Sequence, residues 1–204
     1  VKSLIADEQL GTIGYVRMRV GHNGAVRADS DPDGWLPARF FNRAEAQGGA
    51  LLDLGAHPLY LIRDFMGLPE RVSATFGYAT GRDVDDHAVA TLAYANGAIA
   101  VAEVSFIDQP GTWELDVHGE RGIIRIEMPD LRPRVGWARP NRRERSEWET
   151  IDVPADAASP FGQWVGCLVN GTRDPENLAL ALDLTRLAEA CTRSATEGST
   201  VNLG

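Results

Sequence analysis

Two tight reversals of the chain restrict its fold more than any other feature of the sequence. Asn96-Gly97 lies between two segments in which apolar and polar residues alternate, and it predicts a hairpin turn with positive φ at both positions. A second turn, Gly119 to Gly122, separates two further alternating segments. Strands joined by such short turns pair antiparallel, so we expect a mainly antiparallel sheet. The expected strands span residues 13–22, 71–80, 87–95, 98–106, 112–118, 123–128 and 149–153.

Helices are expected before, between and after these strands, because apolar residues recur there at helical spacing. They span residues 3–10, 50–66 and 160–170, and a last helix begins after Asp174 with Pro175 in its first position. Three or four helices packed on such a sheet make an α+β fold. We therefore expect a two-layer sandwich, in which an open, mostly antiparallel sheet carries its helices on one face.

The first expected strand shows which face of the sheet is buried. Val16, Met18 and Val20 alternate with Tyr15, Arg17 and Arg19 along it. The apolar set is expected to face the helices. The opposite face, which carries the two arginines, is either solvated or pairs with another subunit.

The composition fits one globular domain and argues against several classes of partner. The 204 residues are 44% hydrophobic, and a net charge of −9 repels nucleic-acid phosphates and anionic lipid. No apolar run approaches the length of a membrane helix, about 20 residues, and no signal peptide is visible. We expect a cytoplasmic protein that binds neither nucleic acid nor membrane. Its two cysteines, Cys167 and Cys191, are expected to be small buried hydrophobes.

Residues 48–57 carry a carboxylate and an imidazole at helical spacing. Asp53 and His57 are four apart, so on a helix they lie on one face, one turn apart. A carboxylate orients an imidazole and favours its protonated form, and such an imidazole exchanges protons with a hydroxyl. An ordinary surface pair is the alternative. Pro58 is expected either to kink the helix and tip His57 into a pocket or to make the helix restart.

A long loop, residues 23–47, precedes this helix and is expected to wall the pocket. Asn23, Trp35 and Arg39 are candidate substrate contacts: the indole stacks on a ring, and the other two bind hydroxyls or a carboxylate. His22, at the end of the first strand, is a similar candidate. For each, simple packing or solvent exposure is the alternative. No metal site is expected, because the acidic and histidine residues lack the close spacing of a ligand set.

The string Gly-Gly-x-x-x-Asp-x-Gly-x-His at residues 48–57 resembles a segment of the glucose–fructose oxidoreductase / inositol dehydrogenase (Gfo/Idh/MocA) family. Further short matches follow the order of that family along nearly the whole chain. They are Gly11-Thr12-Ile13-Gly14, Asp86-His87, Asn96-Gly97, Gly119 with Gly122, and Arg193-Ser194-Ala195. The first string is fairly specific, whereas the others are weak singly and consistent in order.

This resemblance implies that residues 1–204 form the C-terminal substrate-binding and oligomerisation domain of a nicotinamide-dependent oxidoreductase. NAD or NADP would be bound mainly by an N-terminal Rossmann domain, which is absent from this chain. His57 would act as general acid/base on the substrate, and Asp53 would bind the substrate or orient the network. Hydride would pass between the nicotinamide and a hydroxyl carbon of a sugar, polyol or related compound.

Two departures from the family pattern affect these expectations. The family often has an acidic residue three positions after the histidine, where this chain has Tyr60. The family also has a glycine-rich G-x-G-x-x-G turn and a lysine in its first domain, and that lysine joins the aspartate and the histidine. Here no G-x-G-x-x-G turn follows a strand, and no residue is a candidate for the lysine, because the only one, Lys2, is at the very edge of the chain. The fragment alone is therefore expected to be inactive.

Two other functions fit the same sequence. One is an NAD-dependent glycosidase, which uses the same hydride step to eliminate a glycosidic bond. The other is a non-catalytic binding or oligomerisation module that works through the open sheet face. An exposed apolar patch on that face would favour assembly, whereas a pocket around Asp53 and His57 would favour catalysis. The expected partners are a small-molecule substrate, the chain's own Rossmann domain and further copies of the chain.

Overall fold

One open sheet of nine strands dominates the computed structural model, which describes residues 1–29, 31–138, 147–152 and 158–203. The strands are β1 (Ile13–Gly21), β2 (Arg71–Gly77), β3 (His87–Ala93), β4 (Ile99–Ser105), β5 (Thr112–Gly119), β6 (Gly122–Glu127), β7 (Arg134–Trp137), β8 (Trp148–Thr150) and β9 (Val201–Asn202). Within the described residues their order across the sheet is β8-β7-β6-β5-β1-β4-β3-β2-β9. Neighbouring strands are antiparallel, except that β1 and β4 are parallel.

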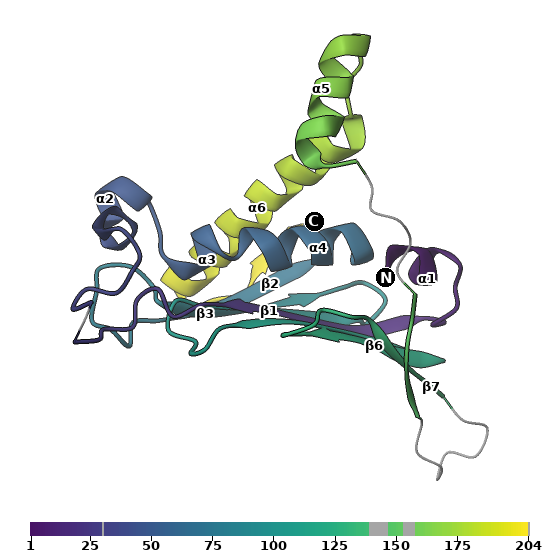
Figure 1. Cartoon of the computed structure of the whole chain (residues 1–204), viewed down its shortest axis with the longest axis horizontal. Coiled ribbons are helices and arrows are strands. Elements are labelled where there is room, and N and C mark those ends of the chain that lie inside the picture. Colours follow the sequence, from purple (N-terminus) through teal and green to yellow (C-terminus); the bar gives the residue numbers. More distant parts are fainter. Residues whose placement is uncertain (30, 139–146, 153–157, 204) are drawn as a thin grey trace.

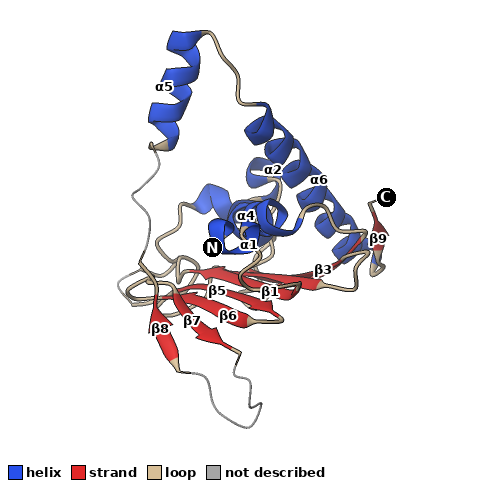
Figure 2. Cartoon of the chain, turned by 90° about the vertical axis from the view of Figure 1, so that its right-hand side faces the viewer, coloured by secondary structure: helices blue, strands red, loops and turns tan. Residues whose placement is uncertain are grey.

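The helices lie on one side of this sheet, as Figures 1 and 2 show. They are α1 (Lys2–Ala6), α2 (Arg43–Ala46), α3 (Ala50–Asp53), α4 (Ala56–Met66), α5 (Pro160–Asn170) and α6 (Pro175–Glu197), with a 3-10 helix at Ala38–Phe41. Helix α4 packs against β1, β4 and α6, and α6 packs against β2. Helix α5 extends away from the sheet. The expected α+β sandwich with an open, mostly antiparallel sheet is confirmed.

The core lies between the sheet and the helices because apolar side chains alternate along the strands. In β1, Val16, Met18 and Val20 are buried, and their neighbours in sequence are not. Leu59 and Ile62 of α4 are fully buried in the same cluster. Burying one side chain of this size contributes about 1.5–3 kcal/mol. The alternation along β1 therefore determines which face of the sheet receives the helices.

Two short strands, β7 and β9, were not predicted. Strand β9 has only two residues and pairs with β2 after the chain has returned along α6. Strand β7 has four residues, of which Val135 and Gly136 are both buried, so no alternation marks it. Strand β8 ends at Thr150 rather than at residue 153, and residues 153–157 lie outside the described part of the chain. The first helix also ends earlier than expected, at Ala6.

The hairpin turn at Asn96-Gly97 differs in type from the prediction. Only Gly97 has a positive φ, 83°, and its N–H donates to the Tyr94 carbonyl at 3.0 Å. The Tyr94 N–H donates to the Ala98 carbonyl, also at 3.0 Å. The loop therefore has three residues and ends in a left-handed glycine, which is another common hairpin geometry.

The two cysteines occupy different surroundings. Cys191 is buried on α6, as expected, and burial raises the pKa of its thiol to about 12. Cys167 is only half-buried on α5, so the expectation of a buried residue is wrong at this position. Among the helices that the structure describes, none is both long and apolar enough to cross a membrane.

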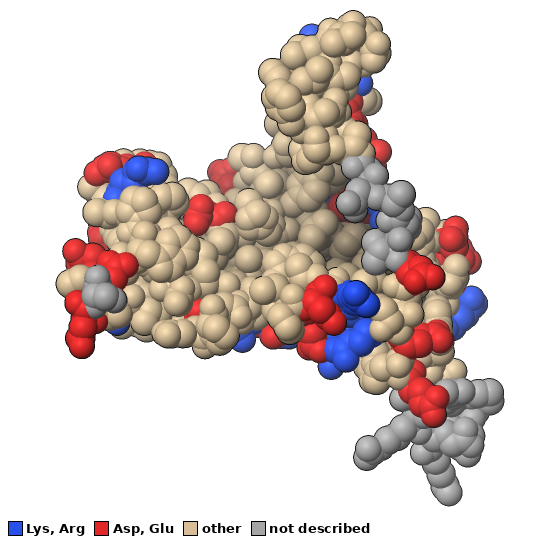
Figure 3. All heavy atoms as spheres, in the orientation of Figure 1, with Lys and Arg blue, Asp and Glu red and all other residues tan. Residues whose placement is uncertain are grey.

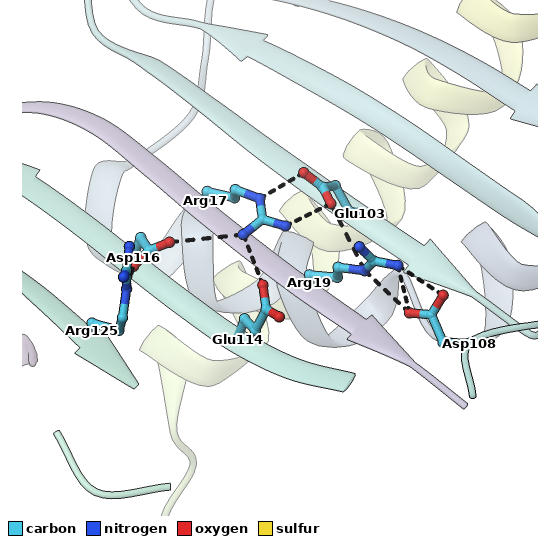
Figure 4. A network of polar contacts seen from close by, with 7 residues as sticks. All are labelled: Arg17, Arg19, Glu103, Asp108, Glu114, Asp116 and Arg125. Carbon is cyan, nitrogen blue, oxygen red and sulfur yellow. Dashed lines mark hydrogen bonds and ion pairs between the residues drawn. The ribbon is translucent and has the colours of Figure 1, made fainter. Parts of the chain in front are cut away.

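The sheet face without helices carries a network of ion pairs, shown in Figure 4. The Arg17 guanidinium on β1 donates to both oxygens of Glu103, at 2.7 and 3.0 Å, and to Glu114 at 2.8 Å. These bonds raise the pKa of Arg17. Arg19 forms a similar pair with Asp108, at 2.8 Å. Much of the charge on this face is therefore neutralised within the chain.

Candidate active site

A buried carboxylate holds the start of α3. Asp85 precedes β3, and its two carboxylate oxygens accept the N–H groups of Gly49 at 2.9 Å and Leu51 at 2.8 Å. Its main-chain carbonyl accepts the N–H of Ala50 at 2.8 Å. The first N–H groups of a helix have no partners inside it, so Asp85 caps α3 from a distant part of the chain. Burial raises the pKa of this carboxyl, and the Leu51 and Gly49 bonds oppose the rise.

The second glycine before α3, Gly49, is required by this contact. A Cβ on Gly49 would overlap the Asp85 carbonyl oxygen, and a Cβ on Gly48 would lie only 2.9 Å from the Cβ of Leu52. A side chain at Gly49 would therefore push α3 away from the residues before β3. Gly49 thus fixes how closely α3, and with it Asp53, packs against the residues before β3.

The helix expected over residues 50–66 is two helices, because α3 ends at Asp53 and α4 begins at Ala56. Pro58 has no N–H to offer the Leu54 carbonyl, which accepts the His57 N–H at 3.0 Å instead. Pro58 therefore falls in the first turn of α4, where a missing N–H costs little. Of the two outcomes that the sequence left open, the structure shows the restart.

Asp53 and His57 lie on the two sides of this break, and both side chains are exposed. Asp53 lines a hollow of about 290 Å³ together with Arg39. His57 lines another hollow, of about 370 Å³, whose walls include Met18 and Trp113. Among the described residues, no hydrogen bond or ion pair joins Asp53 to His57. The structure therefore does not form the direct pair that continuous helical spacing predicts.

His22, Asn23 and Trp35 form one cluster at the end of β1. The Trp35 indole N–H donates to Asn23 Oδ1 at 2.8 Å, and the centroids of the Trp35 and His22 rings are 4.7 Å apart. The His22 ring also stacks on Phe106, with centroids 5.2 Å apart and planes at 8°. His22 Nδ1 accepts the Gly24 N–H at 3.0 Å. These three predicted residues are brought together, and Trp35 keeps an exposed ring.

The negative charge of Asp53 affects the pKa of His22 in this cluster. Burial lowers the pKa of His22, and the negative charges of Asp53 and Asp108 oppose the change. Because Nδ1 accepts an N–H, the neutral ring carries its proton on Nε2. Arg39 shares the hollow of Asp53, and its guanidinium lies 5.3 Å from the centroid of the Phe40 ring. The charge of Asp53 thus acts on His22, and Arg39 lines the same hollow as Asp53, whereas His57 lines the other hollow.

The sequence analysis did not predict a role in the site for three residues that shape it. Asp85 caps α3, Phe106 supports His22, and Trp113 lines the hollow of His57. The acidic pair Asp85-Asp86 directly before a strand could have drawn attention to a structural role. The sequence does not show which helix such a carboxylate caps. No group of three or more His, Cys, Asp and Glu side chains within the described ranges could hold a metal ion.

Comparison with known proteins places this site in a family context. The profile of the GFO/IDH/MocA C-terminal domain matches residues 1–125, which include β1, the long loop and the α3–α4 segment. Curated protein sequences gave no significant match.

Solved structures share the fold. Levoglucosan dehydrogenase in complex with NADH aligns with a TM-score of 0.79 at 20% identity, covering 100% of this chain and 62% of its own. An NAD-binding protein from Listeria innocua aligns with a TM-score of 0.76 at 23% identity, covering 98% and 62%. An oxidoreductase from Agrobacterium radiobacter, in complex with NAD+, L-tartaric acid and magnesium, aligns with a TM-score of 0.73 at 22% identity, covering 98% and 60%.

The likeness to these structures concerns the fold, and this chain spans about three fifths of their length. The profile match is independent of them, covers more than half of the chain and contains Asp53 and His57. The chain therefore belongs to the GFO/IDH/MocA family.

Proposed function

We propose that this chain is the substrate-binding part of an NAD(P)-dependent oxidoreductase that acts on a hydroxyl carbon of a sugar, polyol or related compound. The observation that carries the proposal is the placement of Asp53 and His57 beside two hollows on the two sides of one helix break. Membership of the family supports the reaction class. The NADH complex of levoglucosan dehydrogenase supports the choice of a nicotinamide cofactor.

The described residues do not themselves fit a dinucleotide. Among the described strands only β1 and β4 are parallel, and α3, α4, β2 and β3 lie between them in sequence. A Rossmann-type site holds the pyrophosphate of a dinucleotide with a strand, a glycine-rich turn and a helix in direct succession. We therefore place the cofactor on a separate domain of a longer protein. There the nicotinamide would exchange the hydride, while this chain binds the substrate and moves the proton.

His57 is the proposed general acid/base. Its imidazole lies at a hollow with apolar walls, where it would take the proton from a substrate hydroxyl during oxidation and return it during reduction. Asp53 and Arg39 would bind the remaining hydroxyl or carboxylate groups in their shared hollow. The exposed ring of Trp35, supported by His22 and Asn23, would stack on the apolar face of the substrate.

Replacing His57 tests this function in a full-length parent. His57→Ala should lower turnover by about 10²–10⁴-fold, the usual effect of losing an acid/base group, and leave dinucleotide affinity nearly intact. The absorbance of the reduced nicotinamide, with a panel of sugars and polyols, measures the turnover. His118→Ala is the matched control, because His118 packs on Tyr15 at 5.2 Å on the open sheet face. Unchanged turnover in His57→Ala would contradict the assigned role, and release of sugar from a glycoside would favour the glycosidase.

Assembly through the open sheet face is a second candidate function. Beside the ion-pair network this face exposes three large apolar side chains from different strands, Val89, Ile99 and Trp148. Light scattering of the purified chain measures its mass in solution. If the face joins two copies, Ile99→Lys should convert an oligomer to a monomer, and Leu131→Lys, at an exposed position outside the strands, should not. A wild-type chain that is monomeric at every concentration would count against assembly.

A further inference from the structure

The loop of residues 23–47 folds back on its own start at Trp35. The N–H of Leu36, the next residue, donates to the Gly24 carbonyl at 3.1 Å. Gly34, the residue before Trp35, has a φ of 82°, which glycine adopts without strain. The place of the Trp35 ring in the proposed site therefore depends on how this part of the loop is held against its start.

Arg82 bonds to this loop from another part of the chain. It lies between β2 and β3, and its guanidinium donates to the main-chain carbonyl of Ala25, at 2.9 Å, and to that of Asp33. Among the described residues, no main-chain N–H donates to either carbonyl. Figure 1 shows the loop and the β2–β3 connection at the same end of the sheet, beside α2. Arg82 thus joins the start of the loop to the residues just before Trp35.

The same guanidinium packs on the later part of the loop. Its central carbon lies 3.7 Å from the centroid of the Phe41 ring, at the end of the 3-10 helix that contains Arg39. A cation this close to an aromatic face is attracted by the ring. The Phe41 ring meets that of Phe106, with centroids 6.5 Å apart and planes at 85°, and His22 stacks on Phe106. The contacts of Arg82 therefore lead to the residues that support the proposed substrate contacts.

The connection that carries Arg82 is itself held in place. Asp86 is 1% exposed, and its carboxylate accepts the N–H groups of Ala79 at 3.1 Å and Thr80 at 2.5 Å. One residue earlier, Asp85 caps α3. The loop and α3 are the two elements that border the hollow of about 290 Å³. One short connection therefore holds both sides of this hollow.

The charge of Arg82 persists in these surroundings. Burial and the nearby charge of Arg27 lower the pKa of its guanidinium, and the negative charges of Asp33 and Asp86 oppose the change. Figure 3 shows acidic side chains gathered at this end of the molecule, at the left below α2. An arginine side chain stays charged at neutral pH. Its bonds to the two carbonyls and its contact with the ring are therefore kept under the conditions of an enzyme assay.

We infer that Arg82 is a positioning residue of the proposed active site, whose guanidinium holds residues 23–47 in the arrangement that presents Trp35 to the substrate. The inference rests on the proposed function, in which Trp35 stacks on the substrate. Within the described residues Arg82 lines neither the hollow of Asp53 nor that of His57, so it acts through the loop. A planar guanidinium can donate to two carbonyls and lie on a ring at once, whereas the compact ammonium of lysine cannot do all three.

The indole N–H signals of the 204-residue chain test the positioning without any substrate. Each of the five tryptophans gives one such signal in a proton–nitrogen correlation spectrum, and Trp35→Phe identifies that of Trp35. In Arg82→Met the Trp35 signal should move or broaden, because its bond to Asn23 at 2.8 Å is no longer held, while the other four stay in place. Arg121→Met is the matched control, since Arg121 also donates to a distant carbonyl, that of Glu8 at 3.1 Å. An unchanged Trp35 signal in Arg82→Met would overturn the inference.

Kinetics of the full-length parent show whether this position matters for binding. With the best substrate of the sugar and polyol panel, Arg82→Met should raise KM about tenfold and leave kcat within about threefold, because the loop contributes binding and not chemistry. In a Trp35→Ala background the same change should raise KM no further, because the residue that Arg82 positions is then missing. Arg121→Met should change neither constant. Rises in KM that multiply in the double variant would overturn the inference, since Arg82 would then act through the fold as a whole.

The two measurements separate this inference from the proposed function. A displaced Trp35 signal in Arg82→Met, with a parent that oxidises no sugar or polyol, would support the positioning and contradict the proposed function. An active parent in which Arg82→Met changes neither the signal nor KM would overturn the inference alone. Arg82→Lys keeps the charge and some of the bonds, so it should lie between the wild type and Arg82→Met in both measurements. It also supplies both measurements if Arg82→Met does not fold, and wild-type values in Arg82→Lys would then overturn the inference.

Discussion

His22 links the packing of the candidate site to pH. Its Nδ1 accepts the Gly24 N–H, its ring stacks on Phe106, and burial lowers its pKa. The folded state therefore favours the neutral ring more than the unfolded state does. This preference contributes its full stability above the unfolded pKa, near 6.5, and the contribution is lost as the pH falls toward the lower folded pKa. Protonation of Nδ1 would also break the bond from Gly24.

A phenylalanine at this position should remove part of the pH dependence. The free energy of unfolding of the wild-type chain should fall between about pH 7.5 and pH 5, and His22→Phe should show a smaller fall because its ring packs without titrating. Urea unfolding at the two pH values measures both. His118→Phe, a change on the open sheet face, should retain the wild-type fall. An equal fall in His22→Phe would mean that His22 does not contribute to it.

The sequence predicted the neighbourhood of the candidate site better than its geometry. His22 ends the predicted strand and Asn23 follows it, so their closeness to the loop residue Trp35 could be expected from chain order. The position of His57 depends on how the Leu54 carbonyl is satisfied, because Pro58 leaves it without its usual partner. The sequence allowed two solutions at that point. The catalytic and binding roles of all these residues remain predictions.

Among the elements, α3 is the one that depends most on another part of the chain. It has only four residues, and so short a helix does not hold its place through its own hydrogen bonds. Asp85, 36 residues after Gly49, supplies the partners for its first N–H groups. No sequence pattern within the helix could reveal this cap, because the contact forms only when β3 joins the sheet.

Asp85→Asn should loosen α3 and destabilise the fold by about 1–3 kcal/mol. The carboxamide offers one oxygen where the carboxylate offers two, so one of the N–H groups of Gly49 and Leu51 loses its partner. The free energy of unfolding in urea measures the effect. Asp83→Asn is the matched control, because Asp83 is exposed two residues earlier. A difference between the two variants below about 0.5 kcal/mol would show that the cap matters little.

The other elements show which local signals sufficed. The strand pairs β3–β4 and β5–β6 were predicted because short glycine-containing turns join alternating segments. The start of α6 was predicted from Asp174, whose side chain accepts the Asn177 N–H at 3.0 Å. Strand β9 could not be predicted, because two residues carry no periodicity and their pairing with β2 depends on where α6 ends.

Across the whole molecule, the central place of β1 organises the open sheet face. Although β1 is the first strand in sequence, it lies between β4 and β5. Hairpin turns determine only the neighbours that they join, so this order could not be read from them. It places Arg17 between Glu103 of β4 and Glu114 of β5. Asp116 lies 3.8 Å from the same guanidinium and extends the network to β6.

The Arg17 guanidinium forms ion pairs with carboxylates on both neighbouring strands. Arg17→Met should therefore leave these negative charges facing one another across β1. The free energy of unfolding should fall by about 1–3 kcal/mol at neutral pH, the usual cost of losing hydrogen bonds to a charged group. Protonation of a carboxylate removes its repulsion from the neighbouring carboxylates, so the deficit should shrink as the pH falls toward about 5. Urea unfolding at both pH values measures this, with Arg71→Met at an exposed position on β2 as the control. A deficit that stays the same at both pH values would mean that Arg17 stabilises the sheet by packing its aliphatic stem and not by its charge.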